Sequence, residues 1–226
     1  MDEDAFGLNR TPEESDETSR TPWERRDGSF PADMFRSWMQ AMARPREFFR
    51  SLDPDISLAR PLIFYLVFSV FGSAASTLSW LAIFGDSYRE VFMVPGMEGF
   101  PVNAYLWTNF FFSPFLALIT LLFHVGMVHV GVRMFVPGGQ PIGVTTRTLC
   151  YVAAPWVLAI VPIIGWGVSS LWMVTLAIIG IQRTHRTTFG RAFAAVIVPP
   201  FVLIVVLTMI FVLLGVFLRM VIGGTV

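Results

Sequence analysis

Long uninterrupted runs of apolar residues constrain the fold of this chain more than any other feature of its sequence. Several runs approach or exceed the ~20 apolar residues that a helix needs to cross a bilayer. Apolar residues make up 54% of the chain and charged residues only 14%. We therefore predict an all-α, polytopic membrane bundle of about five transmembrane helices, with spans at about 61–84, 104–135, 147–164, 166–182 and 193–218.

Two of these runs have unusual lengths. The second is longer than a ~30 Å hydrocarbon core requires at 1.5 Å per residue, so we expect it to be kinked, tilted or partly interfacial. The third and fourth are short and are separated only by the sequence PIIGW. They form either two full crossings or a re-entrant hairpin.

The segment before the first span divides into two parts. Residues 1–30 are polar and acidic, which predicts a disordered cytoplasmic tail. Trp23 within it is either a local anchor or an isolated aromatic. Residues 31–52 carry apolar side chains at helical spacing, which predicts an amphipathic helix. That helix lies either at the membrane surface, with Arg44, Arg46 and Arg50 near anionic headgroups, or on the protein's own cytoplasmic face.

The placement of arginine predicts the orientation in the membrane. All sixteen basic residues are arginine, and all sixteen acidic residues lie before Gly99. With the N-terminus in the cytoplasm, most arginines between spans fall on the cytoplasmic side, as the positive-inside rule requires. We predict a multi-pass protein of the bacterial inner membrane with its N-terminus in the cytoplasm and its C-terminus outside.

The sequence carries no motif typical of an enzyme. The only cysteine is Cys150, the predicted spans hold no acidic residue, and His124 and His129 are five residues apart. Five residues turn a helix by about 500°, so the two imidazoles diverge by about 140° and do not form an i, i+4 ligand pair. We predict no catalytic residue, no metal site, no cofactor and no nucleic-acid partner.

The two histidines of the second span are candidates for an intramembrane polar site. His129 lies one turn from Arg133, about 6 Å inside the interface, where it needs no special role. His124 lies about 13 Å from Arg133, near mid-membrane, so it is expected to face the bundle interior and to have a partner. It either makes a structural hydrogen bond or lines a polar pathway, and a metal ligand is the least favoured role.

Two further groups of residues are candidates for function. One is a basic cluster that is either topogenic charge or a contact for lipid headgroups or an acidic partner: Arg183, His185, Arg186 and Arg191. The other is a set of prolines that are either ordinary kinks or the helix breaks of a polar path: Pro114, Pro155, Pro162, Pro199 and Pro200.

An ordered series of residues resembles the Yip-domain family, whose eukaryotic members interact with Ypt/Rab GTPases. The series begins with PREFFRSL and an Arg-Pro start of the first span, and continues at His129 and Gly138-Gly139. It is strongest in TLCYVAAPWVLAIVPIIGWGVSSLWMVTLAIIGIQRTHRTTFGRAFAAV. There the matching positions are Tyr151, Pro155, Pro162, Gly165, Trp172, Gly180, His185, Gly190, Arg191 and Ala192.

The resemblance implies a Yip-like transmembrane domain over residues 53–226, with about five spans and a cytoplasmic N-terminus. The tail composition, the arginine bias and the short loops look bacterial, so a trafficking role through GTPases is not carried over. We hypothesise a non-enzymatic membrane protein that acts through helix-mediated association with membrane partners, as a homo-oligomer, or with membrane lipids. The alternative is a small transporter or lipid-translocating protein with a polar path near His124.

Overall fold

Helices make up nearly all of the part of the chain that the computed structural model describes, residues 21–25, 28–52, 57–84, 102–161 and 164–223. Most of the predicted tail, and Pro162, lie outside these residues. The helices are α2 (Pro22–Arg25), α3 (Phe30–Ala43), α4 (Pro45–Arg50), α5 (Ala59–Phe84), α7 (Val102–Phe135), α8 (Ile142–Tyr151), the 3-10 helix η3 (Ala154–Ile160), α9 (Ile164–Thr184) and α10 (Phe189–Gly223).

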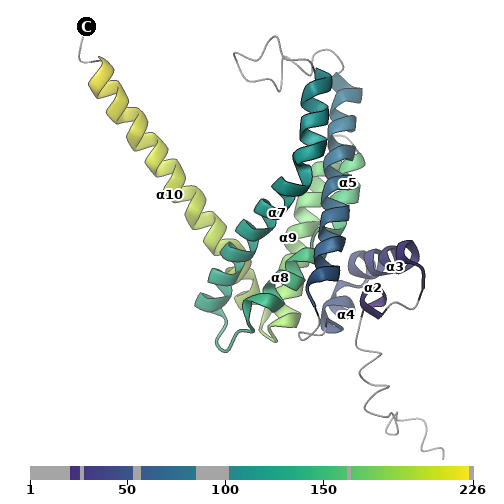
Figure 1. The fold of residues 1–226 in the computed structure, drawn as a ribbon. Helices are drawn as coiled ribbons and strands as arrows, with labels where there is room; N and C mark the ends of the chain where they lie inside the picture. Colours follow the sequence, from purple (N-terminus) through teal and green to yellow (C-terminus); the bar gives the residue numbers. More distant parts are fainter. Residues whose placement is uncertain (1–20, 26–27, 53–56, 85–101, 162–163, 224–226) are drawn as a thin grey trace, which may run out of the picture.

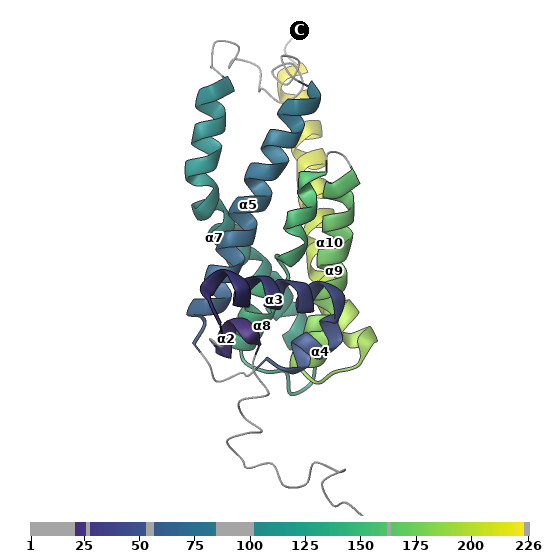
Figure 2. The same cartoon turned by 90° about the vertical axis from the view of Figure 1, so that its right-hand side faces the viewer.

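Within the described residues, five helical segments are long and apolar enough to cross a membrane, which confirms the predicted fold class. They are Ala59–Ser79, Trp107–Phe135, Ile142–Ile160, Ile164–Thr184 and Phe189–Phe217. Figures 1 and 2 show α5, α7, α9 and the α8–η3 segment side by side, whereas α10 diverges from α7. Helices α2, α3 and α4 gather at one end, here called the N-terminal end, and α10 finishes at the opposite end (Figure 1).

The third candidate span is a broken helix. Pro155 lacks a backbone N–H and its ring disfavours a continuous α-helix, so α8 ends at Tyr151 and η3 follows. Side chains from three other helices donate hydrogen bonds to the carbonyls of η3: Trp38 Nε1 to Ala154 at 2.9 Å, Ser169 Oγ to Pro155 at 2.8 Å and Ser79 Oγ to Ile160 at 2.8 Å. The break is therefore satisfied by packing, as lipid-embedded backbone requires.

The prolines of the longer spans lie inside continuous helices. Pro114 lies within α7, and Pro199 and Pro200 lie within α10. Because Pro114 offers no N–H to the carbonyl four residues earlier, Phe110 O would lose its partner. The hydroxyl of Ser113 donates to that oxygen at 2.8 Å. The chain thus compensates for the proline locally.

Helix α10 meets α7 at one point of close backbone approach. A Cβ added to Gly131 would lie 2.0 Å from the carbonyl oxygen of Ala195, so only glycine fits there. Small residues at helix crossings bring backbones together in membranes. Beyond this crossing α10 is exposed along most of its length, for example at Phe211, which is 77% exposed.

The N-terminal segment differs from the sequence-based expectation. Residues 21–25 lie within the range predicted to be disordered, yet they include α2, and Trp23 is only 3% exposed. Trp23 Nε1 donates to Arg60 O at 2.9 Å, and the Arg60 guanidinium lies 5.3 Å from the centre of the tryptophan ring. Trp23 is therefore an anchor, because a buried aromatic with a polar partner repays the entropy of ordering a short segment.

Helix α3 lies across the axis of the spans at the N-terminal end (Figure 2). Its inner side contributes Met34 and Ala41 to the core, and Trp38 and Met42 pack against that core. Phe35 and Met39 are exposed. The helix thus packs on the protein itself and still presents apolar side chains outward.

Candidate functional site

A buried ion pair joins the N-terminal segment to the third candidate span. Arg147 Nε lies 3.3 Å from Glu24 Oε1, and the two side chains are 2% and 0% exposed. The hydroxyl of Tyr151 donates to the same carboxylate oxygen at 2.9 Å. The carboxylate supplied by α2 therefore neutralises an arginine that lies inside a candidate membrane-spanning segment, where an unpaired charge would be costly.

A second polar cluster, here called the histidine bridge, joins α7, α8 and the end of α9. It consists of His129, Thr145, His185 and the backbone N–H of Gln140. Gln140 N donates to His185 Nδ1 at 3.0 Å, and His185 Nε2 lies 3.1 Å from Thr145 Oγ1. Thr145 Oγ1 also lies 3.0 Å from His129 Nδ1, and Arg133 Nε donates to His129 Nε2 at 3.4 Å.

These contacts assign a single hydrogen-bond pattern to the histidine bridge. Because Arg133 and Gln140 donate, one nitrogen of each imidazole must be an acceptor, so both rings are neutral. The other nitrogen of each ring then donates to Thr145 Oγ1, which has two lone pairs. Protonation of His185 would place a hydrogen on Nδ1, which would then face the N–H of Gln140 and could no longer accept its hydrogen bond. The bridge therefore stabilises the fold only while His185 is neutral.

We expect the stability of the protein to fall as the pH drops from about 6.5 to about 4. Burial, with a smaller contribution from the positive charge that His129 gains on protonation, lowers the pKa of His185 from 6.5 to about 4. Between these two pH values the unfolded chain therefore binds more protons than the folded protein does. The stability of the folded protein consequently rises with pH across the interval. The loss of stability is at most about 3.4 kcal/mol. Thermal unfolding against pH measures it.

A His185→Gln variant is the control for this pH dependence. Its amide retains a donor toward Thr145 but does not titrate. The variant should have a flatter profile between these two pH values, with lower stability above pH 7. Equal slopes in the two proteins would contradict the assignment to His185.

Three arginines from two regions of the chain line a continuous basic depression. Its inner pocket of about 150 Å³ and an adjoining depression of about 350 Å³ share Arg50 of α4 with Arg183 and Arg186 at the end of α9. We call these three residues the arginine cluster. Arg183 Nε is buried and has no hydrogen-bond partner among the described residues. The inner pocket is also lined by Phe49, Leu52, Gln140, Val144, Arg147 and Thr184.

Arg186 has a backbone conformation that usually belongs to glycine. Its φ is 49°, the positive value typical of the residue that follows a helix in a Schellman motif. The motif's hydrogen bonds are present: Thr187 N donates to Gln182 O at 3.0 Å, and Arg186 N donates to Arg183 O at 3.4 Å. An arginine here costs of the order of 1 kcal/mol relative to glycine.

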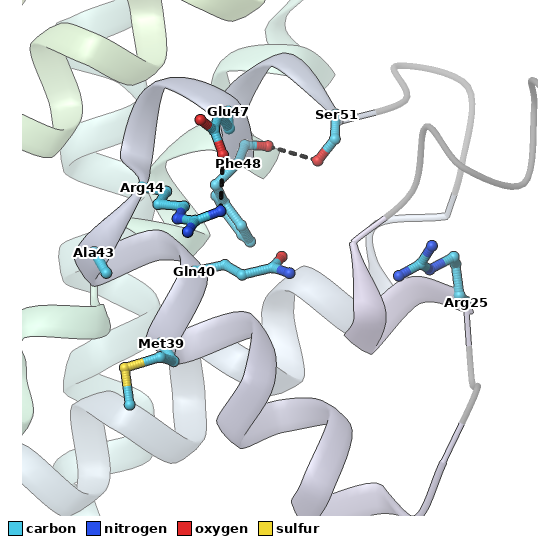
Figure 3. A pocket seen from close by; sticks show the side chains of 8 residues that line it. All are labelled: Arg25, Met39, Gln40, Ala43, Arg44, Glu47, Phe48 and Ser51. Atoms are coloured by element: carbon cyan, nitrogen blue, oxygen red, sulfur yellow. Dashed lines mark hydrogen bonds and ion pairs between the residues drawn. The ribbon is translucent and has the colours of Figure 1, made fainter. Parts of the chain in front are cut away.

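A larger depression lies between the N-terminal helices (Figure 3). It has a volume of about 540 Å³ and is lined by residues of α2, α3 and α4, by Arg44 between α3 and α4, and by Ser51. Two of its charged side chains neutralise each other, since Arg44 Nη1 lies 3.8 Å from Glu47 Oε2. This internal pairing makes it a weaker candidate for binding an ion than the arginine cluster.

The structure separates residues that the sequence grouped together. Arg183 and Arg186 line one depression, but His185 is 4% exposed and points toward Thr145, and Arg191 is exposed on α10. His129 joins the histidine bridge. His124 is exposed rather than directed into the bundle, because the positions that pack inward on this part of α7 are Leu121, Val125 and Val128.

Sequence reasoning did not identify Glu24, Tyr151 or Thr145 as members of polar clusters. Glu24 stood among many acidic residues of the tail, and nothing local distinguishes it from them. Arg147 carried the one available signal, since a charged residue within an apolar helix requires a partner. Among the described residues, no group of three or more His, Cys, Asp or Glu side chains is placed to hold a metal ion.

A family model matches most of the chain. The family model of the Yip1 domain matches residues 39–222. The chain belongs to the Yip1-domain family. The matched region of this Yip1-domain protein begins within α3 and ends within α10, so it includes all five candidate spans, the histidine bridge and the arginine cluster. No match was found among the curated proteins or the solved structures compared.

Proposed function

We propose that this Yip1-domain protein is a non-enzymatic protein of the bacterial inner membrane that acts by associating its spans with another membrane helix. In this proposal its N-terminal end faces the cytoplasm and the end of α10 faces outside. The placement of α2 and the end of α10 at opposite ends of the bundle supports this orientation (Figure 1). So does the arginine distribution between the spans.

The observation that carries the proposal is the exposure of His124 on the surface of α7. Its Nδ1 lies 2.8 Å from Thr120 O, so this nitrogen donates the proton and Nε2 remains an acceptor. No donor to Nε2 is recorded among the described residues. An ionisable side chain that faces lipid at this depth is costly unless it is paired.

A partner helix that brings a hydroxyl or amide donor to the depth of His124 would satisfy this acceptor. Hydrogen bonds between membrane helices contribute about 1 kcal/mol, roughly fivefold in an association constant. The side chains around His124 suit such a contact. Thr120, four residues before His124 on the same face of α7, is exposed and small.

Photo-crosslinking in native membranes tests this association. A photoreactive residue at Phe123, beside His124, should form a protein adduct. The same residue at Val174 of α9 is the control, because it is also exposed and lies nine residues from Arg183, as His124 does from Arg133. We expect His124→Leu to reduce the Phe123 adduct about fivefold at unchanged expression. Equal adducts at both positions, or only lipid adducts, would contradict the proposal.

The second candidate function is transport or lipid translocation along a path near His124. The same exposed imidazole favours it, because ionisable residues in spans also mark polar pathways. Reconstituted liposomes separate the two functions. Loss of flux of a labelled lipid in His124→Leu, with the Phe123 adduct unchanged, would favour translocation over helix association.

A further inference from the structure

We propose that the arginine cluster binds the phosphate group of an anionic phospholipid. Arg50, Arg183 and Arg186 line one depression at the N-terminal end of the bundle. Guanidinium groups pair with phosphate through charge-assisted hydrogen bonds, often two at a time. The inference depends on the proposed function in one respect only, which is that the N-terminal end of the bundle faces the cytoplasm.

The described residues that line the depression do not neutralise the charge of the arginine cluster. Among the described residues, neither the inner pocket nor the adjoining depression is lined by an acidic side chain. The fourth arginine of the inner pocket, Arg147, pairs with Glu24. The Nε of Arg183 is buried and has no hydrogen-bond partner among the described residues.

The position of the cluster favours a lipid over a dissolved anion. Arg183 lies in the last turn of α9, at the end of a candidate span. Phe49, Leu52 and Val144 line the same inner pocket, so apolar side chains adjoin the guanidinium groups. A phospholipid joins its phosphate, through the short glycerol ester region, to apolar acyl chains, which matches that change in polarity.

The backbone of Arg186 provides an independent argument. The positive φ at this position suits glycine and costs energy for arginine. Glycine would complete the same Schellman hydrogen bonds without a side chain. The arginine instead brings a third guanidinium to the depression that Arg50 and Arg183 line. Arg186 is thus held in a strained backbone conformation beside a depression with excess positive charge, which suggests that it has a role in binding.

An Arg186→Gly variant separates binding from folding. The full-length protein in an uncharged detergent is titrated with phosphatidylglycerol, and its thermal stability is followed. In the wild type the midpoint should rise with lipid concentration, as linkage requires of a ligand that binds only the folded state. Arg186→Gly should be as stable as the wild type or more stable without lipid, yet bind about tenfold more weakly. Arg50→Gln, at an exposed position, should weaken binding similarly.

Two comparisons make the result specific. Arg191→Gln removes one positive charge from the same end of the protein but outside the depression, and it should bind as tightly as the wild type. Phosphatidylcholine, whose trimethylammonium group is repelled by the cluster, should give a much smaller rise in the midpoint.

Three results would overturn the inference. Undiminished binding by Arg186→Gly and Arg50→Gln would remove the cluster from the site. Equal weakening by Arg191→Gln would show only general attraction by charge. An equal rise with the same concentration of inorganic phosphate would show a site for a dissolved anion rather than a lipid. None of these results alters the Phe123 adduct, so the proposed function is tested separately.

Discussion

Replacing Glu24 with glutamine is expected to destabilise the folded protein by about 3–5 kcal/mol. The substitution keeps the shape of the side chain but leaves the charge of Arg147 buried without its carboxylate. It also weakens the hydrogen bond that Tyr151 donates. Thermal unfolding in detergent measures the loss. Cleavage by trypsin near Arg25 should become faster, because α2 would detach from the bundle.

The paired substitution Glu24→Leu with Arg147→Met separates the ion pair from simple packing. Replacing both partners of a buried pair by apolar residues of similar size is often neutral or stabilising. The double variant should therefore be markedly more stable than Glu24→Gln. If it proved equally unstable, the shape of the site rather than its charge would be responsible for the effect.

Replacing Gly131 with alanine is expected to cost about 3 kcal/mol and to separate α7 from α10. The added methyl group would lie 2.0 Å from the carbonyl oxygen of Ala195, which is backbone and cannot rotate away. The two helices must therefore move apart, and the packing around their crossing is lost. Spin labels at exposed Met134 and Phe193 would report the increased separation, since the only native cysteine, Cys150, is buried.

Gly126→Ala is the matched control on the same helix. A Cβ at Gly126 meets no atom within 4 Å, so the variant should gain up to about 1 kcal/mol from the higher helix propensity of alanine. The difference between the two variants isolates the close approach, because both change glycine to alanine within α7. Similar stabilities in the two variants would contradict the importance of the Gly131 crossing.

The helical bundle could be predicted from sequence because hydropathy is a local property. A run such as residues 61–84 prefers lipid whatever the rest of the chain does, and α5 occupies the same region. The effect of proline was only partly predictable. Pro155 ends α8, whereas Pro114 lies within a continuous helix beside the hydroxyl of Ser113.

The candidate site was predictable only in part. The sequence placed Arg183 and Arg186 together because both follow one span, and their proximity depends on three residues of chain. It associated Arg50 with a different helix, and only the packing of α4 against α9 brings it beside them. For His124, counting residues from Arg133 gave an expected depth in the membrane. It did not give the direction of the side chain, which is exposed and does not face the bundle interior as expected.

The sequence alone therefore determined three properties of this Yip1-domain protein: that its helices suit a lipid bilayer, that its fold is all-α, and how many candidate spans it has. These follow from transfer free energies that add along each segment. Only the tertiary structure decided which polar groups meet: Glu24 with Arg147, His185 with Thr145, and Arg50 with Arg183. The physical reason is that each contact joins segments far apart in the chain. Its existence depends on how whole helices pack, which no local pattern records.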